Sequence, residues 1–193
     1  MYKYLLITIT LVFGAANASE QDRIFGEGKT AFSNKEFDKA YSIWLPLASN
    51  GYVPAQDTIG YLYSNGLGVK QNHEKAVEWY KKAAEGHHLE AMFNLANAYR
   101  LGRGVPKNIE LAEDLYRKSL CSGYKYSIVG LVALYSNGQL QPRSEAEESA
   151  LKKDLDKLKS PEYRRQLINM SITNSSLNNS LNRTCYADAL HAD

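Results

Sequence analysis

The sequence holds four histidines and two cysteines, the side chains most often found as zinc ligands: His73, His87, His88, His191, Cys121 and Cys185. They form no His-Glu-x-x-His and no Cys-x-x-Cys motif. The neighbouring side chains of His87 and His88 point apart, so they cannot easily share one ion. The spacing therefore predicts no metal site, and the histidines are expected to be solvent-facing turn residues.

Covalent catalysis has an equally weak basis in this sequence. A thiol nucleophile would need Cys121 beside a histidine, and a disulfide to Cys185 would remove that thiol. The short Gly-x-Gly sequences follow no predicted strand, which argues against a phosphate-binding loop. Glu147 and Glu148 fall in a densely charged stretch where a solvated helix face is favoured over acid–base chemistry. We expect a protein that is not an enzyme and needs no cofactor.

Residues 1–18 have the features of a secretory signal peptide. Lys3 is followed by an almost unbroken apolar run over 5–16, and Ala16 and Ala18 are small residues of the kind that precede a cleavage site. The run is shorter than the ~20 residues of a membrane-spanning helix. We expect cleavage after Ala18 and a periplasmic or secreted protein, with an N-terminal membrane anchor as the alternative.

The charge of the chain is nearly balanced. The full sequence has a formal net charge of +2, and Lys3 is the only charged residue within 1–18. A near-neutral mature chain gives no indication of a basic patch for a nucleic-acid partner. Its mixed charges are typical of a soluble protein without a stable membrane span.

The two cysteines both lie in the part of the chain expected to be exported. An even number of cysteines in an oxidising compartment favours pairing. A bridge between Cys121 and Cys185 would close a long loop, which the chain-entropy model values at about 4 kcal/mol. The alternative is a buried thiol at Cys121 and a free thiol on a loose tail.

Residues of several kinds recur at intervals of 36. The recurring sets are Tyr63, Tyr99 and Tyr135; Gly66, Gly102 and Gly138; Tyr80 and Tyr116; and Ala40, Ala76 and Ala112. A period of this length is typical of a stacked array of repeats, because one unit cannot bury its apolar face alone. We predict an all-α solenoid of antiparallel helix pairs.

The apolar spacing predicts the helices of this array. We expect helices near 22–32, 37–49, 54–65, 73–85, 90–100, 109–121 and 127–135, then a charged helix over 144–159 and a last one from 160. Gly66 and Gly102 are expected to end first helices with positive φ, and Asn72 and Asn108 to cap second helices. The predicted organisation is a signal peptide (1–18), a solenoid of about four helix pairs with a decayed last pair (19–170), and an Asn/Ser-rich tail (171–193).

The second repeat carries a specific motif. It reads Tyr-Ser-Asn-Gly-Leu-Gly-Val over 63–69 and Lys-Ala-Val-Glu-Trp-Tyr-Lys-Lys-Ala-Ala-Glu-Gly over 75–86. This pattern closely resembles the Sel1-like repeat (SLR), a relative of the tetratricopeptide repeat. The resemblance covers two full repeats, about 54–123, and a decayed copy follows them. It implies right-handed superhelical stacking in which the first helix of each pair lines a concave groove.

The resemblance also implies which side chains line that groove. Mapped onto the first helices, they are Asp57, Tyr61, Ser64, Asn65, Phe93, Asn97, Arg100 and Tyr126. Tyrosine, arginine, asparagine and phenylalanine on a rigid scaffold are favoured in recognition surfaces. The alternative is that exposed tyrosine and asparagine are merely tolerated at these positions.

The leading hypothesis is a non-catalytic protein-binding module of the bacterial periplasm that holds a protein partner in the groove. An immunity protein that neutralises a toxin delivered to the same compartment is an alternative, as is a regulator of envelope assembly or host interaction. A cell-wall or β-lactam hydrolase is a remote alternative, since the chain lacks the cysteine pairs inside each repeat of the SLR proteins described in that role. The partner and the oligomeric state stay open.

Overall fold

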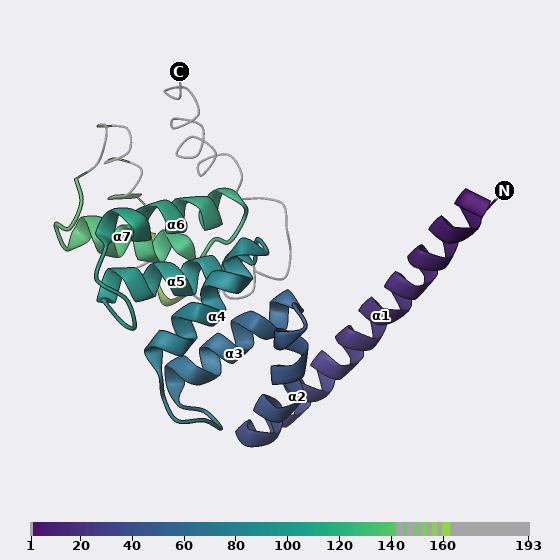
Figure 1. Ribbon diagram of the computed structural model, residues 1–193. Helices are drawn as coiled ribbons and strands as arrows, with labels where there is room; N and C mark the ends of the chain where they lie inside the picture. The colour runs from purple at the N-terminus through teal and green to yellow at the C-terminus, as the bar shows by residue number, and fades with distance from the viewer. Residues whose placement is uncertain are drawn as a thin grey trace. The chain divides into compact units, whose positions relative to one another are not determined.

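The structure is a computed structural model, and the part of the chain that it describes is built from helices (Figure 1). It describes residues 2–141, 145, 149, 152–153, 156–157 and 160–162, with side chains from Ala18 onward. The helices are α1 (Tyr2–Ser33), α2 (Phe37–Ser49), α3 (Val53–Asn65), α4 (His73–Glu85), α5 (Leu89–Leu101), α6 (Ile109–Cys121) and α7 (Ser127–Ser136). No strand occurs in these described ranges, and none of their helices is long and apolar enough to span a bilayer.

The helices from α2 to α7 begin and end within one residue of the predicted bounds. The first helix is the exception, because α1 starts at Tyr2 rather than at Asp22. Residues 2–21 contain no proline and only one glycine, so nothing in the local sequence ends the helix there. Most of the charged helix predicted over 144–159 and the whole tail over 171–193 lie outside the described residues.

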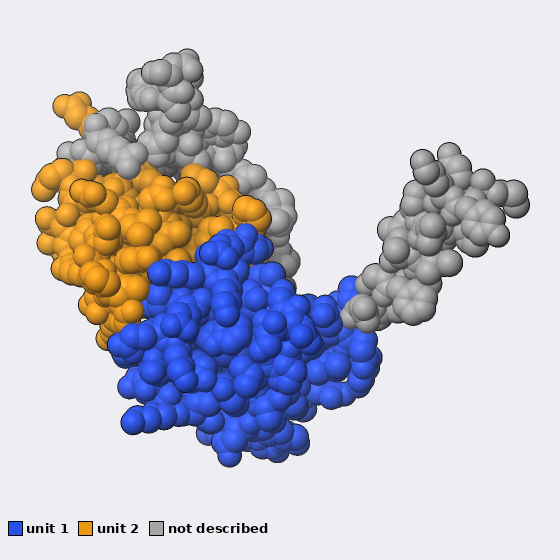
Figure 2. All heavy atoms as spheres, viewed as in Figure 1, with its two compact units in different colours: residues 1–86 blue, residues 87–193 orange. Residues whose placement is uncertain are grey.

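The chain forms two compact units, which Figure 2 shows in different colours. Unit 1 is Met1–Gly86 and contains α1 to α4; unit 2 is His87–Asp193 and contains α5 to α7. Within unit 1, α1 packs on α2, α2 on α3 and α3 on α4. Within unit 2, α6 packs on both α5 and α7. Consecutive helices thus form pairs, as the repeat pattern predicted.

The loop between the two helices of a pair has the same backbone in both units. Gly66 and Gly102 end α3 and α5 with φ of 68° and 67°, a left-handed conformation that suits glycine. Asn72 caps α4 by accepting a hydrogen bond from the Lys75 backbone N–H at 2.8 Å. Asn108 caps α6 in the same way at 2.9 Å. The predicted helix stops and caps are confirmed.

Aromatic residues at intervals of 36 fill the core next to glycines. In unit 1 a Cβ on Gly28 would lie 2.1 Å from the indole nitrogen of Trp44, and a Cβ on Gly60 would lie 2.7 Å from the ring of Tyr80. The indole nitrogen donates to the Phe25 carbonyl at 3.0 Å. A side chain on either glycine would overpack the core, so helix spacing in unit 1 depends on both.

Tyr116 has the same position in α6 that Tyr80 has in α4. It is fully buried, at 0% exposure, and a Cβ on Gly130 would lie only 2.3 Å from its ring. The ring of Phe93 lies 5.7 Å from it on the α5 side. Tyr116 therefore joins α5, α6 and α7 within unit 2.

The tyrosines at 63 and 135 lie in equivalent positions but contact different partners. In unit 1 the hydroxyls of Tyr63 and Tyr41 are 2.8 Å apart. Burial, with a smaller effect from this hydrogen bond, raises the pKa of Tyr41 to about 12. In unit 2 the Tyr135 hydroxyl donates to Glu113 Oε1 at 2.8 Å and accepts from Arg117 Nη2 at 2.7 Å. The repeat keeps the tyrosine while its neighbours vary.

Glu113 and Arg117 form a buried ion pair one helical turn apart on α6. Arg117 Nε and Nη2 each lie 2.8 Å from Glu113 Oε1. Each side chain is only 10% exposed. Because solvent screens such a pair poorly, loss of one partner is far more damaging than for a pair at the surface.

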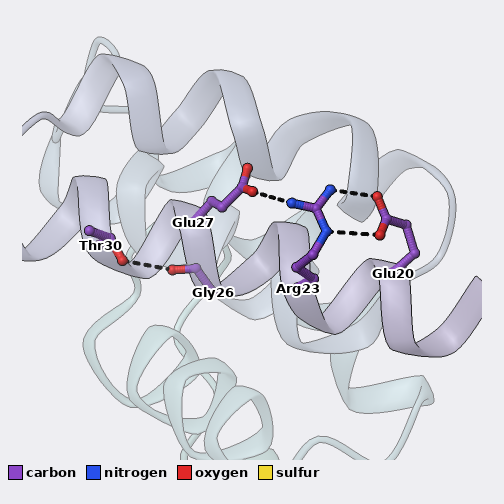
Figure 3. Close-up of polar contacts among 5 residues, drawn as sticks. All are labelled: Glu20, Arg23, Gly26, Glu27 and Thr30. Atoms are coloured by element: carbon purple, nitrogen blue, oxygen red, sulfur yellow. Dashed lines mark hydrogen bonds and ion pairs between the residues drawn. The ribbon is translucent and has the colours of Figure 1, made fainter.

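Polar contacts also organise the described side chains of α1 (Figure 3). Arg23 donates to both oxygens of Glu20, at 2.9 and 2.6 Å, and also contacts Glu27 one turn later. These groups are exposed, so the pairs add little stability. The Tyr52 hydroxyl donates to Asp22 and ties α1 to the turn before α3.

Candidate partner-binding surface

Four of the predicted partner-binding residues lie on α3 in unit 1. Tyr61 is 42% exposed, and its ring packs edge to face against Phe32 of α1 with the centroids 6.2 Å apart. Asn65 is exposed and donates from Nδ2 to the Tyr61 carbonyl at 2.9 Å. Ser64 is half-buried. Asp57 is only 7% exposed, so little of its side chain is available to a partner.

The other four predicted residues lie in unit 2. Phe93, Asn97 and Arg100 come from α5, and Tyr126 immediately precedes α7. All four are half-buried. The three side chains of α5 occur at intervals of four and three, so they share one helix face. The structure thus brings these four together within one unit.

Asn97 and Arg100 are held in place by the buried hydroxyl of Tyr116. This hydroxyl donates to Asn97 Oδ1 at 2.8 Å and accepts from Arg100 Nε at 3.2 Å. Arg100 Nη2 also donates to Asn97 Oδ1, at 3.3 Å. Burial raises the pKa of Tyr116, and the hydrogen bond from Arg100 opposes this rise. The phenol therefore stays protonated at neutral pH and fixes both surface side chains.

A row of aromatic rings leads from this core to the surface. Phe93 lies 5.6 Å from Tyr124, and Tyr124 lies 5.5 Å from Tyr126. Burial, and then the charge of Glu90, raises the pKa of Tyr126. Tyr124 was not predicted as a site residue, although its position beside Tyr126 in a Tyr-rich turn was a usable signal.

The prediction that every histidine faces solvent is wrong for His88. This residue is half-buried and caps α5, because its Nδ1 accepts a hydrogen bond from the Ala91 backbone N–H at 3.4 Å. Burial lowers its pKa below the ordinary 6.5, while Glu90 opposes that shift. A neutral imidazole is therefore part of the folded unit 2.

Acidification is expected to destabilise unit 2 through His88. The unfolded chain takes up a proton near pH 6.5, and the folded chain only at lower pH. The contribution of His88 to stability is complete above pH 6.5 and is lost as the pH falls through the lower, folded pKa. This pH-dependent contribution is measured by urea unfolding of the wild type and of His88→Asn between pH 7.5 and 5.5. Asparagine is chosen because it can also cap a helix but does not titrate. If the free energy of unfolding changed equally with pH in the two proteins, His88 would not be the group responsible.

The remaining reactive groups show no catalytic arrangement in the described part of the chain. No group of three or more His, Cys, Asp and Glu side chains lies there in a position to hold a metal ion. Cys121 is the last residue of α6 and has no free thiol. Cys185 lies outside the described residues, so the predicted pairing stays a prediction.

The fold defines an all-α helical-repeat protein of the solenoid class. Residues 53–88 and 89–124 each match the family model of the Sel1 repeat. The chain therefore contains two consecutive Sel1-like repeats, as its motif predicted. Sel1-repeat proteins generally mediate protein–protein interaction and are generally non-catalytic scaffolds.

Several known proteins are similar to parts of this chain. A Sel1 repeat protein from Oxalobacter formigenes is 34% identical with a TM-score of 0.54, over 58% of this chain and 46% of that one. A protective antigen of uropathogenic Escherichia coli strains, which displays an SLR fold, has a TM-score of 0.64 at 22% identity, over 90% and 39% of the chains. The chitin synthase regulator SKT5 of Saccharomyces cerevisiae is 42% identical over 50 residues, or 26% of this chain and 7% of that protein. The chain thus spans less than half of each.

Proposed function

We propose that the chain is a non-catalytic binding module of the bacterial periplasm that holds a protein partner against the first helices of its repeats. One observation carries this proposal: aromatic and polar side chains on α3 and α5 are partly exposed yet fixed by the core beneath them. Arg100 and Asn97 are held by a fully buried tyrosine, and Tyr61 rests on Phe32. Side chains that are already ordered lose little entropy on binding.

The composition of this surface supports a protein partner. Tyrosine and arginine are the residues that most often dominate the binding energy of protein interfaces. The aromatic row of Phe93, Tyr124 and Tyr126 offers apolar contact area, and Asn97 and Arg100 offer donors beside it. A surface of this kind suits a folded partner or an extended segment of one.

Export and a disulfide form part of the proposal. The features of residues 1–18 and the absence of a free thiol at Cys121 support them. In cells that secrete the full chain, mass spectrometry of the purified protein is expected to find an N-terminus at Ser19. Thiol counting is expected to find no reactive cysteine before reduction and two after it. An unprocessed chain, or a reactive thiol on the unreduced protein, would exclude this arrangement.

Affinity capture with matched variants tests the binding surface. The tagged wild type, the double variant Tyr61→Ala with Arg100→Ala, and the control Lys81→Ala with Lys118→Ala are exposed to periplasmic extract. The control residues are exposed on the second helices α4 and α6. A partner retained by the wild type and the control but lost by the first variant is the expected result.

Because Arg100 contacts Tyr116, the Tyr61→Ala single variant serves as a second test that leaves unit 2 untouched. Circular dichroism of each variant shows whether it is folded. If folded variants keep every captured protein, the proposed surface is wrong. If the captured partner is a toxin whose activity the protein abolishes, the immunity alternative gains direct support.

A further inference from the structure

A surface pocket in unit 1 has a composition that the repeat itself does not require. It has a volume of about 370 Å³ and is lined by Tyr63, Val69, Lys70, Gln71, Asn72 and Lys75. Pockets that hold small ligands range over about 300–1,000 Å³, so this one suits one or two side chains of a partner. It lies beside the predicted binding face of α3, because Gln71 Nε2 donates to the Ser64 carbonyl at 2.8 Å.

The next repeat provides an internal comparison for this loop. Tyr99, Val105 and Asn108 repeat the residues at 63, 69 and 72, and the backbone angles of the capping asparagines agree closely. Pro106 and Leu111 replace the lysines at 70 and 75. The loop therefore folds without either lysine, and their presence in the pocket needs another explanation.

The charges of these two lysines are not neutralised by the described part of the protein. Neither Lys70 nor Lys75 forms an ion pair there, and both are exposed. Lys75 Nζ lies 5.3 Å from the centre of the Tyr63 ring, which draws the ammonium group over the pocket. The Tyr63 hydroxyl is engaged by Tyr41. The pocket is thus lined by two positively charged side chains, one of which lies over an aromatic ring.

The loop that carries Lys70 is anchored to the rest of unit 1. Gly68 has φ of 66°, and a Cβ on it would lie 2.4 Å from the backbone of Phe37 at the start of α2. The backbone of Gly68 therefore packs directly against the start of α2, and this packing fixes the loop. The pocket wall is therefore in place before any ligand arrives, which lowers the entropy lost on binding.

We propose that this pocket binds the carboxylates of an acidic segment of the protein partner, with Lys70 and Lys75 as the cationic contacts. The inference rests on the proposed function and adds the chemistry of the partner to it. Two ammonium groups spaced around a pocket of this size suit two neighbouring acidic side chains. Opposite charge favours such a segment over a neutral one and speeds the encounter.

The test uses the mature protein and a short probe, the blocked peptide acetyl-Gly-Glu-Glu-Gly-amide. Titration is followed by the backbone amide signals of residues 66–75 in two-dimensional NMR. We expect saturable shifts at low salt that weaken as the ionic strength rises. The double variant Lys70→Gln with Lys75→Gln is expected to bind about tenfold more weakly, as the loss of two exposed charge contacts implies.

Matched controls separate this site from general charge attraction. Lys107→Gln removes one lysine from the equivalent loop of the next repeat and is expected to leave binding unchanged. The peptide with glutamine in place of both glutamates is expected to give no saturable shift. Equal binding of the glutamine peptide, equal weakening by Lys107→Gln, or no saturable shift at all would overturn the proposal. Equal binding of inorganic phosphate would also overturn it, because the pocket would then be a small-anion site.

The same variants separate this inference from the proposed function. Suppose that the variant at Tyr61 and Arg100 loses the captured partner while the variant at Lys70 and Lys75 keeps it. The binding module then stands, and the acidic segment is wrong. Loss of the partner by both variants supports both. If neither folded variant loses it, the proposed surface and the pocket are both wrong.

Discussion

Replacement of Arg117 by methionine is expected to lower the free energy of unfolding by about 3 kcal/mol. The guanidinium donates to Glu113 and Tyr135 from a position that is 10% exposed, and methionine cannot replace those hydrogen bonds. The carboxylate of Glu113 would lose the positive charge that lies 2.8 Å from it. Urea unfolding followed by circular dichroism measures the loss.

The repeat supplies the matched control for this variant. Val77 has in α4 the position that Glu113 has in α6. The double variant Glu113→Val with Arg117→Met is therefore expected to recover most of the lost stability, because it removes both charges together. A single variant that costs less than about 1 kcal/mol, or a double variant less stable than the single one, would contradict the assignment.

Tyr116→Ala is expected to cost about 3–5 kcal/mol, the usual range for removing a large aromatic side chain from a core. The residue is fully buried, its ring lies 5.7 Å from that of Phe93, and Gly130 packs against it without a side chain, so removal of the ring is expected to leave a cavity. The same unfolding measurement applies. A loss below about 2 kcal/mol would show that the site collapses more easily than its packing indicates.

The companion variant Tyr116→Phe separates packing from hydrogen bonding. It keeps the ring and removes only the hydroxyl that holds Asn97 and Arg100, so a loss of about 1 kcal/mol is expected. Partner capture should also weaken, although no exposed residue has changed. A variant with wild-type capture would mean that these two side chains need no support from beneath.

Most of the fold followed from local rules. Glycines 66 and 102 end helices because their φ is positive, and asparagines 72 and 108 cap helices because their side chains reach the next turn. Such features depend on a few neighbouring residues, so a sequence displays them directly. The bounds of α2 to α7 were predictable for that reason.

The binding surface was less predictable, because burial depends on residues far apart in the chain. Asp57 has the helical phase of an outward residue, yet only 7% of it is exposed. His88 lies in a polar turn but caps α5 from a half-buried position. The network of Glu113, Arg117 and Tyr135 joins α6 to α7, and only the i, i+4 spacing of its charged pair was visible.

Both tryptophans of the chain, Trp44 and Trp79, belong to unit 1. Tryptophan emission therefore reports on the N-terminal half alone, whereas circular dichroism responds to helices in both halves. A substitution in α6 that shifts the dichroism melting curve and leaves the emission curve in place would show that the halves melt independently. Coincident curves would show one cooperative transition. The native sequence thus carries its own optical label for the cooperativity between repeats.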